Sequence, residues 1–402
     1  MSTSLFDAVE LAPRDPILGL TEAFATDPRT TKVNLGVGVY YDDNGKIPLL
    51  RAVREAERAR VDAASPRGYL PMEGIAAYDA AVQRMLFGND SPLISAGRLV
   101  TAQSLGGTGA LKIGADLLRR INGNAKVLIS DPSWENHRAL FEGAGFHVAS
   151  YPYYDPATHG VDFDGFCAAL DAAPAGTIVV LHACCHNPTG VDISLGQWRE
   201  VVDLVKQRGL VPFLDIAYQG FGQGIEVDSA AVRMFAEAGL TFLVASSFSK
   251  SFSLYGERVG ALTIVTSSRE EAARVLSQLK RVIRTNYSNP PTHGGAVVSA
   301  VLADPHLRKL WEEELAEMRQ RIKAMRERLV SGLKSRGVSR DFSFVLQQNG
   351  MFSYSGLNPA QVERLREEFG IYAVATGRIC VAALNTKNVD YVCDSIAAVL
   401  RH

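Results

Sequence analysis

The sequence is poor in several features that would mark particular classes of protein. It has only 5 cysteines among 402 residues, an odd and scattered set with no disulfide framework, so we expect a reducing, cytoplasmic environment. No apolar run approaches the roughly 18 residues of a membrane span. Residues 1–10 lack the basic and apolar regions of a secretory signal. The net charge of −1 gives no overall attraction for nucleic acid or an anionic membrane, so we expect neither as a partner.

What the sequence does contain is typical of a two-domain globular protein. Hydrophobic residues make up 47% and charged residues 21%, and 402 residues are too many for one ordinary core. From about residue 100, apolar runs alternate with helical stretches, which predicts a mostly parallel sheet covered by helices on both faces. The predicted strands are Lys126–Ser130, Thr177–Ala183, Val211–Ala217, Thr241–Ala245 and Val259–Val265.

The last hundred residues follow a different pattern. A long charged amphipathic helix is predicted from Pro305 to about Ser335, and it would link the sheet to a smaller C-terminal domain. Short predicted strands then alternate with predicted helices. The strands are Phe342–Leu346, Gly350–Tyr354 and Arg378–Ala382, and the helices are Pro359–Phe369 and Asn388–Leu400.

One lysine, Lys250, stands just beyond the predicted strand 241–245, among small hydroxyl and aromatic side chains. Ligands of α/β sheets bind beyond the C-terminal ends of the strands. A partly apolar setting lowers the pKa of a lysine and lets its amine act as a nucleophile. Ser247, Ser249 and Arg258 supply hydroxyls and a fixed cation that suit a phosphate. A reactive amine beside a phosphate site suggests a Schiff base to pyridoxal phosphate, although a lone lysine is more often a surface residue.

A glycine-rich turn within Gln103–Leu111 precedes a predicted helix. Its free N–H groups and the positive end of the helix dipole suit a phosphate. Glycine turns before helices are common, so this turn gains weight only together with Lys250 and Arg258.

An acidic residue, Asp215, lies within an apolar strand. A buried carboxylate needs a partner, either a protonated pyridine nitrogen or a neighbouring arginine or histidine. Tyr218 lies three residues further on and could reach the same ligand. Trp134, after another predicted strand, either stacks on a planar ring or belongs to the core, and His137 lies one helical turn beyond it.

The segment 182–186 holds two histidines and two cysteines, which invites a metal-site interpretation. These four positions are too closely spaced for structural zinc, and no second cluster completes them, so we expect no metal. Asn187, in the following turn, could donate to a ligand oxygen. Arg378, flanked by Gly377 and Ile379, suits a carboxylate, and Arg284 ends a helical stretch.

Together these segments resemble the class I aminotransferases of pyridoxal phosphate fold type I, specifically the aspartate and aromatic-amino-acid aminotransferases. The resemblance covers nearly the whole chain. The most specific segments are Ser247–Lys250, Tyr255–Gly260, Cys184–Gly190, Asp215–Gly220 and Asn286–Pro291.

The resemblance implies a role for each candidate residue. Lys250 would hold pyridoxal 5'-phosphate as a Schiff base and carry the proton at the substrate α-carbon. Asp215 would keep the pyridine nitrogen protonated, and Tyr218 would bond the phenolic oxygen of the ring. The remaining cofactor contacts would be Gly106, Gly107, Thr108, Trp134, His137, Asn187, Ser247, Ser249, Arg258 and Tyr69 of the partner subunit. The substrate contacts would be Gly38, Trp134, Asn187, Arg284 and Arg378.

The resemblance also implies a fold and an assembly. We expect a large domain with a mostly parallel seven-stranded sheet flanked by helices, together with a smaller α+β domain. Residues 46–305 would form the large domain, residues 306–402 most of the small domain, and residues 1–45 a segment that joins it. Tyr69 and Arg284 would serve the neighbouring subunit, so we expect a homodimer with shared active sites.

The substrate is the finer question. In related enzymes a residue at the position of Arg284 binds the distal carboxylate of aspartate, glutamate and their 2-oxo acids. Tyr41 and Ile47 resemble the aromatic branch, whereas Thr108 and Asn289 resemble the aspartate branch. We expect transamination of tyrosine and phenylalanine with 2-oxoglutarate, giving the aromatic 2-oxo acid and L-glutamate, with some aspartate activity. The alternative is an aspartate aminotransferase, which converts aspartate and 2-oxoglutarate to oxaloacetate and glutamate.

Two further classes compete with an aminotransferase. A decarboxylase or β-lyase on the same fold is disfavoured by Arg378 and Arg284, which would hold the α-carboxylate in the plane of the ring. A non-catalytic regulator is disfavoured because it need not keep Lys250.

Overall fold

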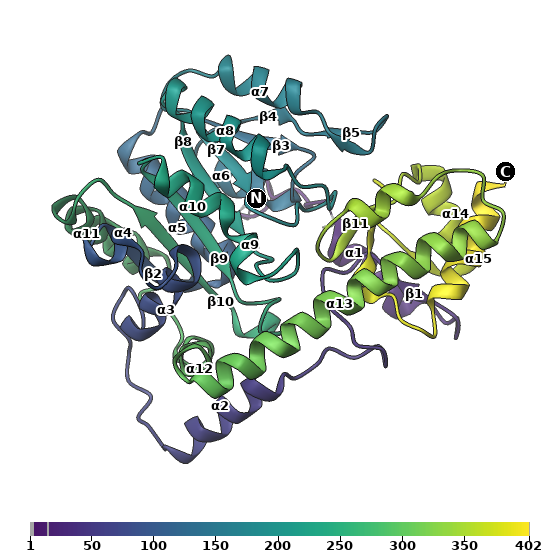
Figure 1. The fold of residues 1–402 in the computed structure, drawn as a ribbon, viewed down its shortest axis with the longest axis horizontal. Helices are drawn as coiled ribbons and strands as arrows, with labels where there is room; N and C mark the ends of the chain where they lie inside the picture. Colours follow the sequence, from purple (N-terminus) through teal and green to yellow (C-terminus); the bar gives the residue numbers. More distant parts are fainter. Residues whose placement is uncertain (1–3, 14–15, 402) are drawn as a thin grey trace.

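A seven-stranded sheet forms the centre of the computed structural model, which describes residues 4–13 and 16–401 (Figure 1). The strand order is β2-β10-β9-β8-β7-β3-β4, and only β10 runs antiparallel to its neighbours. The prediction of a mostly parallel, helix-flanked sheet of seven strands is confirmed. The strands are β2 (Leu99–Leu105), β3 (Lys126–Asp131), β4 (His147–Pro152), β7 (Ile178–His182), β8 (Val211–Ile216), β9 (Phe242–Ser247) and β10 (Val259–Val265).

Successive side chains of each strand point to opposite faces, so the sheet has a core on both sides. In β8, Phe213 packs in the core formed with α5 (Gly106–Ile121), α6 (Glu135–Gly143) and α11 (Arg269–Asn286). Its neighbour Leu214 packs in the core on the other face. The helices of that second face are α3 (Ala76–Phe87), α7 (Phe163–Asp171), α8 (Leu195–Arg208) and α10 (Ala230–Glu237).

The topology brings several strand ends to one edge of the sheet. Because they are parallel, β3, β7, β8 and β9 all finish at this edge, and β2 finishes there too. The antiparallel strand β10 begins there, directly after Arg258. Loops from distant parts of the sequence therefore meet at a single edge.

The long helix α13 (Pro305–Ser335) joins this sheet to the C-terminal lobe, by which we mean residues 336–401 (Figure 1). The carboxylate of Asp304 caps its first turn by accepting the N–H groups of His306 and Leu307, and Pro305 occupies the first helical position. Trp311 is buried near the helix start and Leu333 near its end. The predicted helix from Pro305 to Ser335 is confirmed.

The C-terminal lobe contains α14 (Pro359–Phe369) and α15 (Val389–Leu400), with β11 (Phe352–Tyr354) antiparallel to β13 (Arg378–Cys380). The early strand β1 (Val33–Asn34) pairs in parallel with β12 (Ile371–Tyr372), so the N-terminal segment adds to this lobe. Shorter elements complete the chain. They are α1 (Pro16–Thr26), α2 (Arg51–Asp62), α4 (Pro92–Ser95), β5 (Tyr154–Asp155), β6 (Gly160–Val161), α9 (Ile225–Asp228), η1 (Tyr255–Glu257) and α12 (Thr292–Ala303).

Two strand predictions in this lobe need correction. The segment predicted as the strand Phe342–Leu346 is the 3-10 helix η2 (Ser343–Gln347). Asp341 accepts hydrogen bonds from the backbone N–H and the hydroxyl of Ser343, which starts a turn and prevents an extended chain. The strand predicted over Arg378–Ala382 ends at Cys380, where η3 (Val381–Ala383) begins.

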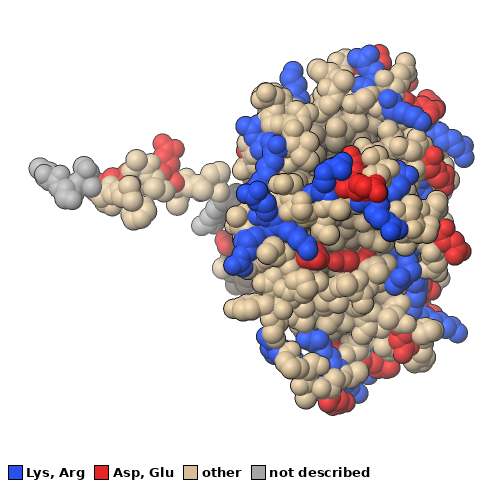
Figure 2. Space-filling view, turned by 90° about the vertical axis from the view of Figure 1, so that its left-hand side faces the viewer, with Lys and Arg blue, Asp and Glu red and all other residues tan. Residues whose placement is uncertain are grey.

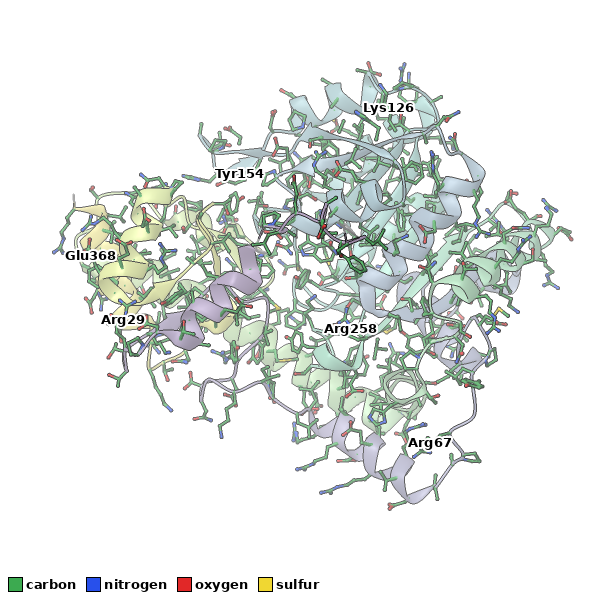
Figure 3. The ribbon with its side chains drawn as sticks, turned by 180° about the vertical axis from the view of Figure 1, so that it is seen from behind. Arg29, Arg67, Lys126, Tyr154, Arg258 and Glu368 are labelled. Carbon is green, nitrogen blue, oxygen red and sulfur yellow. The ribbon has the colours of Figure 1, made fainter. Side chains whose placement is uncertain are left out.

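Two surface features bear on the site. Residues 4–13 leave the body as an extended arm with exposed apolar side chains, among them Leu5 and Leu11 (Figure 2). Tyr154 of the β5–β6 hairpin, labelled in Figure 3, packs edge-on against Tyr354 of the C-terminal lobe, with 5.2 Å between ring centroids. In the part of the chain that the structure describes, no helix is long and apolar enough to cross a membrane.

Candidate active site

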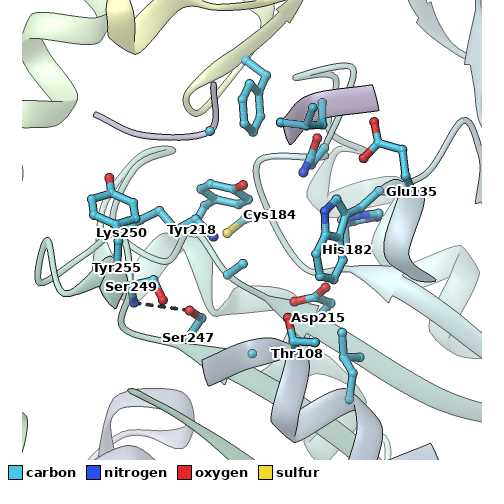
Figure 4. A pocket seen from close by; sticks show the side chains of 18 of the residues that line it. Thr108, Glu135, His182, Cys184, Asp215, Tyr218, Ser247, Ser249, Lys250 and Tyr255 are labelled. Atoms are coloured by element: carbon cyan, nitrogen blue, oxygen red, sulfur yellow. Dashed lines mark hydrogen bonds between the residues drawn. The ribbon is translucent and has the colours of Figure 1, made fainter. Parts of the chain in front are cut away.

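A cavity of about 250 Å³ opens at the edge where the strand ends meet, and residues of the C-terminal lobe close it (Figure 4). Most of the predicted site residues line it, although they come from segments far apart in the sequence. The predicted residues on its wall are Gly38, Gly107, Thr108, Trp134, Asn187, Asp215, Tyr218, Ser247, Ser249, Lys250, Arg258 and Arg378.

The side chain of Lys250 points into this cavity from the turn after β9. Its Nζ lies 4.9 Å from the centroid of the Tyr218 ring. Burial lowers the pKa of Lys250 to about 8, with a further contribution from the charge of Arg258, while Asp215 opposes the shift. A large fraction of this amine is therefore neutral slightly above neutral pH, which is the form that acts as a nucleophile or base.

A buried carboxylate, Asp215, faces the same cavity from the end of β8. Its Oδ2 accepts a hydrogen bond from His137 Nε2 at 2.8 Å, and His137 Nδ1 lies 2.8 Å from the Ser133 hydroxyl. Burial opposes ionisation of Asp215, but the hydrogen bond from His137 and the electrostatic effect of its ring outweigh it, and the pKa of Asp215 lies below its ordinary value. The cavity thus holds a fixed negative charge suited to a cationic ring nitrogen.

The opposite end of the cavity can hold an anion. Arg258 has φ +55°, and its Nη1 donates to the Tyr255 carbonyl at 3.0 Å and approaches Ser249 Oγ at 3.5 Å. A Cβ on Gly106 would lie 2.6 Å from Arg258 Nη2, so only glycine lets the guanidinium pack against the start of α5. The first N–H groups of that helix have no partner within the helix, which adds positive potential.

A second cationic group enters from the C-terminal lobe. Arg378 Nη2 donates to the Gly36 carbonyl at 2.7 Å, and Nη1 donates to Asn187 Oδ1 at 3.3 Å. Its Cζ lies 4.4 Å from the centroid of the Phe352 ring. Among the described residues, the buried Nε has no hydrogen-bond partner. A buried guanidinium with a free donor fits a substrate carboxylate.

Trp134 and His182 form the wall beside Asp215. Trp134 stands directly before α6, and its ring contacts His137 edge-on at 5.3 Å between centroids. The two ring nitrogens of the partly buried His182 are themselves buried and have no partner among the described residues, and its pKa is lowered to about 3 by desolvation and then by His137. Both rings present flat surfaces that suit a planar ligand.

Four predicted residues do not line the cavity. His137 lies behind Asp215, and Gly106 lies behind Arg258. Tyr69 is 97% exposed, and the exposed Arg284 donates to the hydroxyl of Ser288. Within one chain, therefore, Tyr69 and Arg284 are not brought to the site.

Several residues of the cavity wall were not among the predicted site residues. Phe352 and Ile17 are apolar, and the sequence does not distinguish an apolar wall residue from a residue of the core. Glu135 directly follows Trp134, so its place in the sequence could have indicated that it lies near the site. Tyr255 accepts a hydrogen bond from the backbone N–H of Tyr40 at 2.9 Å, which ties the segment that carries Gly38 to the cavity.

Comparisons with known proteins identify the family of the chain. A family model described as aminotransferase class I and II matches residues 30–396. The chain is 68% identical to an aspartate aminotransferase of Pseudomonas aeruginosa, over 99% of this chain and 100% of the relative. It is 54% identical to an aromatic-amino-acid aminotransferase of Escherichia coli, over 98% and 100%. The crystal structure of an aromatic-amino-acid aminotransferase of Burkholderia pseudomallei, covalently bound to pyridoxal phosphate, is similar with a TM-score of 0.98 and 73% identity, covering 99% and 100%.

Proposed function

The chain belongs to the aminotransferase class I and II family and is a pyridoxal-phosphate-dependent aminotransferase, and we propose that tyrosine and phenylalanine are its preferred amino donors. The acceptor is 2-oxoglutarate, which yields the aromatic 2-oxo acid and L-glutamate, and aspartate is a slower donor. The observation that carries the aminotransferase chemistry is the meeting of the Lys250 amine, the ionised Asp215 and the guanidinium of Arg378 at one cavity. The preference for aromatic donors rests on the resemblance of Tyr41 and Ile47 to the aromatic branch.

The residues of the cavity fit pyridoxal phosphate. Arg258, Ser247, Ser249 and the start of α5 would hold the phosphate, and the backbone at Gly106 leaves no room for a side chain beside Arg258. Trp134 would stack on the ring and Asp215 would pair with the protonated ring nitrogen, while His137 supports that carboxylate. Tyr218 and Asn187 would bond the phenolic oxygen. When bound, the cofactor supplies the electron sink that stabilises a carbanion at the substrate α-carbon.

Lys250 has two tasks in this proposal. With the cofactor bound, its amine would hold the cofactor covalently at rest, and during turnover the freed amine would move the proton at the substrate α-carbon. The lowered pKa, about 8, suits this second task, because a general base works best when its pKa is near the working pH. Asp215 keeps its negative charge throughout, since its pKa lies below the ordinary value.

The α-carboxylate of the substrate binds Arg378, with Asn187 beside it. The Gly36 carbonyl and the Phe352 ring fix the guanidinium plane, so binding does not have to order this side chain. Gly38 lies on the wall, where a Cβ would be in ordinary van der Waals contact with the Phe352 ring at 3.4 Å, so the backbone of this segment comes close to the site.

We also propose a homodimer in which Tyr69 and Arg284 complete the site of the neighbouring subunit. Two observations support it: both side chains are exposed and lie off the cavity of their own chain, and the arm of residues 4–13 carries exposed apolar side chains that a partner would cover (Figure 2). The division into residues 46–305 and 306–402, with residues 1–45 joining the latter, is likewise a proposal, and the pairing of β1 with β12 supports it.

A hybrid dimer tests both the sharing and the role of Arg284. Lys250→Ala and Arg284→Ala chains carrying different tags are co-expressed, and the mixed dimer is purified. If Arg284 serves the partner, one site of the hybrid carries both defects and the other site is intact, so aspartate turnover returns. If Arg284 serves its own chain, no site is intact and aspartate turnover stays low.

The Arg284→Ala homodimer tests the assignment of substrates. We expect it to lose about tenfold or more in kcat/KM for aspartate and to keep most of its activity with tyrosine and phenylalanine, because only a dicarboxylate needs a second cation. Equal losses with all three amino acids would mean that Arg284 does not bind the distal carboxylate.

A further inference from the structure

The turn that carries Asn187 is closed by the partly buried carboxylate of Asp192, for which the roles above give no function. Asp192 Oδ1 accepts the N–H of His186 at 2.9 Å, and Oδ2 accepts the N–H of Cys185, also at 2.9 Å. Cys185 has φ +51°, in the left-handed region that a residue with a side chain rarely adopts. These two hydrogen bonds therefore stabilise a strained backbone just before Asn187.

Asp192 also connects this turn to the C-terminal lobe. Its Oδ2 accepts a hydrogen bond from Asn349 Nδ2 at 3.2 Å. Two backbone bonds run alongside it: Asn349 N–H donates to the Gly190 carbonyl at 2.7 Å, and Tyr354 N–H donates to the Thr189 carbonyl at 3.2 Å. The turn is thus attached to the segment that leads into β11, the strand that pairs with the strand of Arg378.

The charge of Asp192 strengthens these bonds. Burial raises the pKa of Asp192 to about 6, and the N–H groups of His186 and Cys185 and the amide of Asn349 counteract the rise by favouring the charged form. The carboxylate is therefore mainly ionised at neutral pH, and hydrogen bonds to a charged acceptor are stronger than those to a neutral one.

We propose that Asp192 is a positioning residue that holds Asn187 against Arg378. Its carboxylate holds the turn by accepting the N–H groups of Cys185 and His186. It also holds the C-terminal lobe, which supplies Arg378, by accepting the side-chain amide of Asn349. Asn187 Oδ1 lies 3.3 Å from Arg378 Nη1, so a displaced turn would separate two groups that meet at the substrate α-carboxylate. This inference rests on the proposed function, in which Asn187 also bonds the cofactor's phenolic oxygen.

The variant Asp192→Asn tests the proposal with little change in volume. A carboxylate accepts on both oxygens, whereas an amide accepts on one, so the variant must leave at least one of the three donors unpaired. Asp162→Asn is the matched control: Asp162 is another carboxylate of the sheet-bearing part that accepts a backbone N–H, that of Gly165, and the cavity wall does not include it. Asn349→Ala removes the side-chain bond between Asn349 and Asp192, together with the 3.4 Å bond from Gln223 to Asn349, and keeps the two backbone bonds to the lobe.

Two readouts are used on the holoenzyme. The first is the pH midpoint at which the absorption of the bound cofactor changes, which reports the hydrogen bond to its phenolic oxygen. The second is KM for tyrosine compared with kcat. For Asp192→Asn we expect the midpoint to rise by about one pH unit and KM to rise about tenfold, with a smaller change in kcat. For Asn349→Ala we expect the rise in KM with the midpoint unchanged, and for Asp162→Asn neither change.

The possible failures are distinguishable. A wild-type protein that binds no cofactor, or whose cofactor absorption does not depend on pH, overturns the proposed function. A normal wild-type titration together with wild-type midpoint and KM in Asp192→Asn overturns the positioning role alone. If Asp192→Asn does not fold, Asn349→Ala decides, because it leaves the bonds to Cys185 and His186 in place. An unchanged KM in that variant overturns the proposal.

Discussion

Replacing Lys250 by methionine in the cofactor-free protein should change how stability depends on pH. The folded-state pKa of Lys250 is about 8, below the ordinary value of 10.5, chiefly because burial disfavours the charged amine. Between these two values the unfolded chain binds more protons than the folded chain. The stability of the wild type therefore gains a contribution that grows as the pH rises through this window, and the Lys250→Met variant lacks it.

The size of this effect follows from the shift. A change from 10.5 to about 8 corresponds to about 3 kcal/mol of folding free energy. The two proteins can differ in their free energy of unfolding at about pH 7. By about pH 11 that difference should have changed by about 3 kcal/mol in favour of the wild type. Other groups titrate in both proteins and cancel in the comparison.

Urea unfolding of the two cofactor-free proteins measures the difference. Protein concentration is held fixed, because association would contribute to stability. Lys309→Met, at an exposed lysine of α13, controls for the substitution itself. The free energies of unfolding of the wild type and Lys250→Met are compared from pH 7 to pH 11. If their difference stays constant within the uncertainty of the extrapolation, the pKa of Lys250 is not lowered in the folded protein.

Two further substitutions probe the two ends of the cavity. Gly260→Ala should weaken the binding of pyridoxal phosphate by about tenfold or more, because its Cβ would lie 2.3 Å from the Gly106 carbonyl carbon and push the anion cradle aside. Titration of the cofactor-free protein with pyridoxal phosphate measures this affinity. An unchanged affinity would mean that the phosphate does not bind beside Gly106 at the start of α5. Arg378→Lys should raise KM for every amino acid by about tenfold to a hundredfold and leave cofactor affinity unchanged, because lysine cannot keep the bond to the Gly36 carbonyl and also donate a planar pair to a carboxylate. Steady-state kinetics with tyrosine and aspartate check it, and an unchanged KM would mean that the α-carboxylate binds elsewhere.

Much of the sheet could be predicted because its strands are buried on both faces and read as uninterrupted apolar runs. For the same reason the functional side chains stood out, since Asp215 and Lys250 are polar residues inside or just after such runs. The two remaining strands, β2 and β4, were harder to predict: β2 carries Gln103 and Ser104, and β4 carries His147 and Ser150, so neither is a purely apolar run.

The remaining features depend on tertiary contacts without a local signature. The orientation of Arg378 is set by a backbone carbonyl, that of Gly36, more than 300 positions away, and by an aromatic ring, Phe352. Asp192, in a polar turn, is indistinguishable in sequence from an exposed turn residue. The 3-10 helix η2 replaced a predicted strand because of the turn that Asp341 starts. The cytoplasmic location stays a prediction.

The half-reaction without an acceptor tests the central claim most directly. Purified holoenzyme is mixed separately with L-tyrosine, L-phenylalanine and L-aspartate, and the conversion of the bound cofactor from its pyridoxal to its pyridoxamine form is followed by absorption. We expect conversion with all three, faster at limiting substrate with the two aromatic amino acids, and none in the Lys250→Ala variant. Conversion with aspartate alone would contradict the aromatic preference, and conversion by Lys250→Ala at the wild-type rate would contradict the role of Lys250.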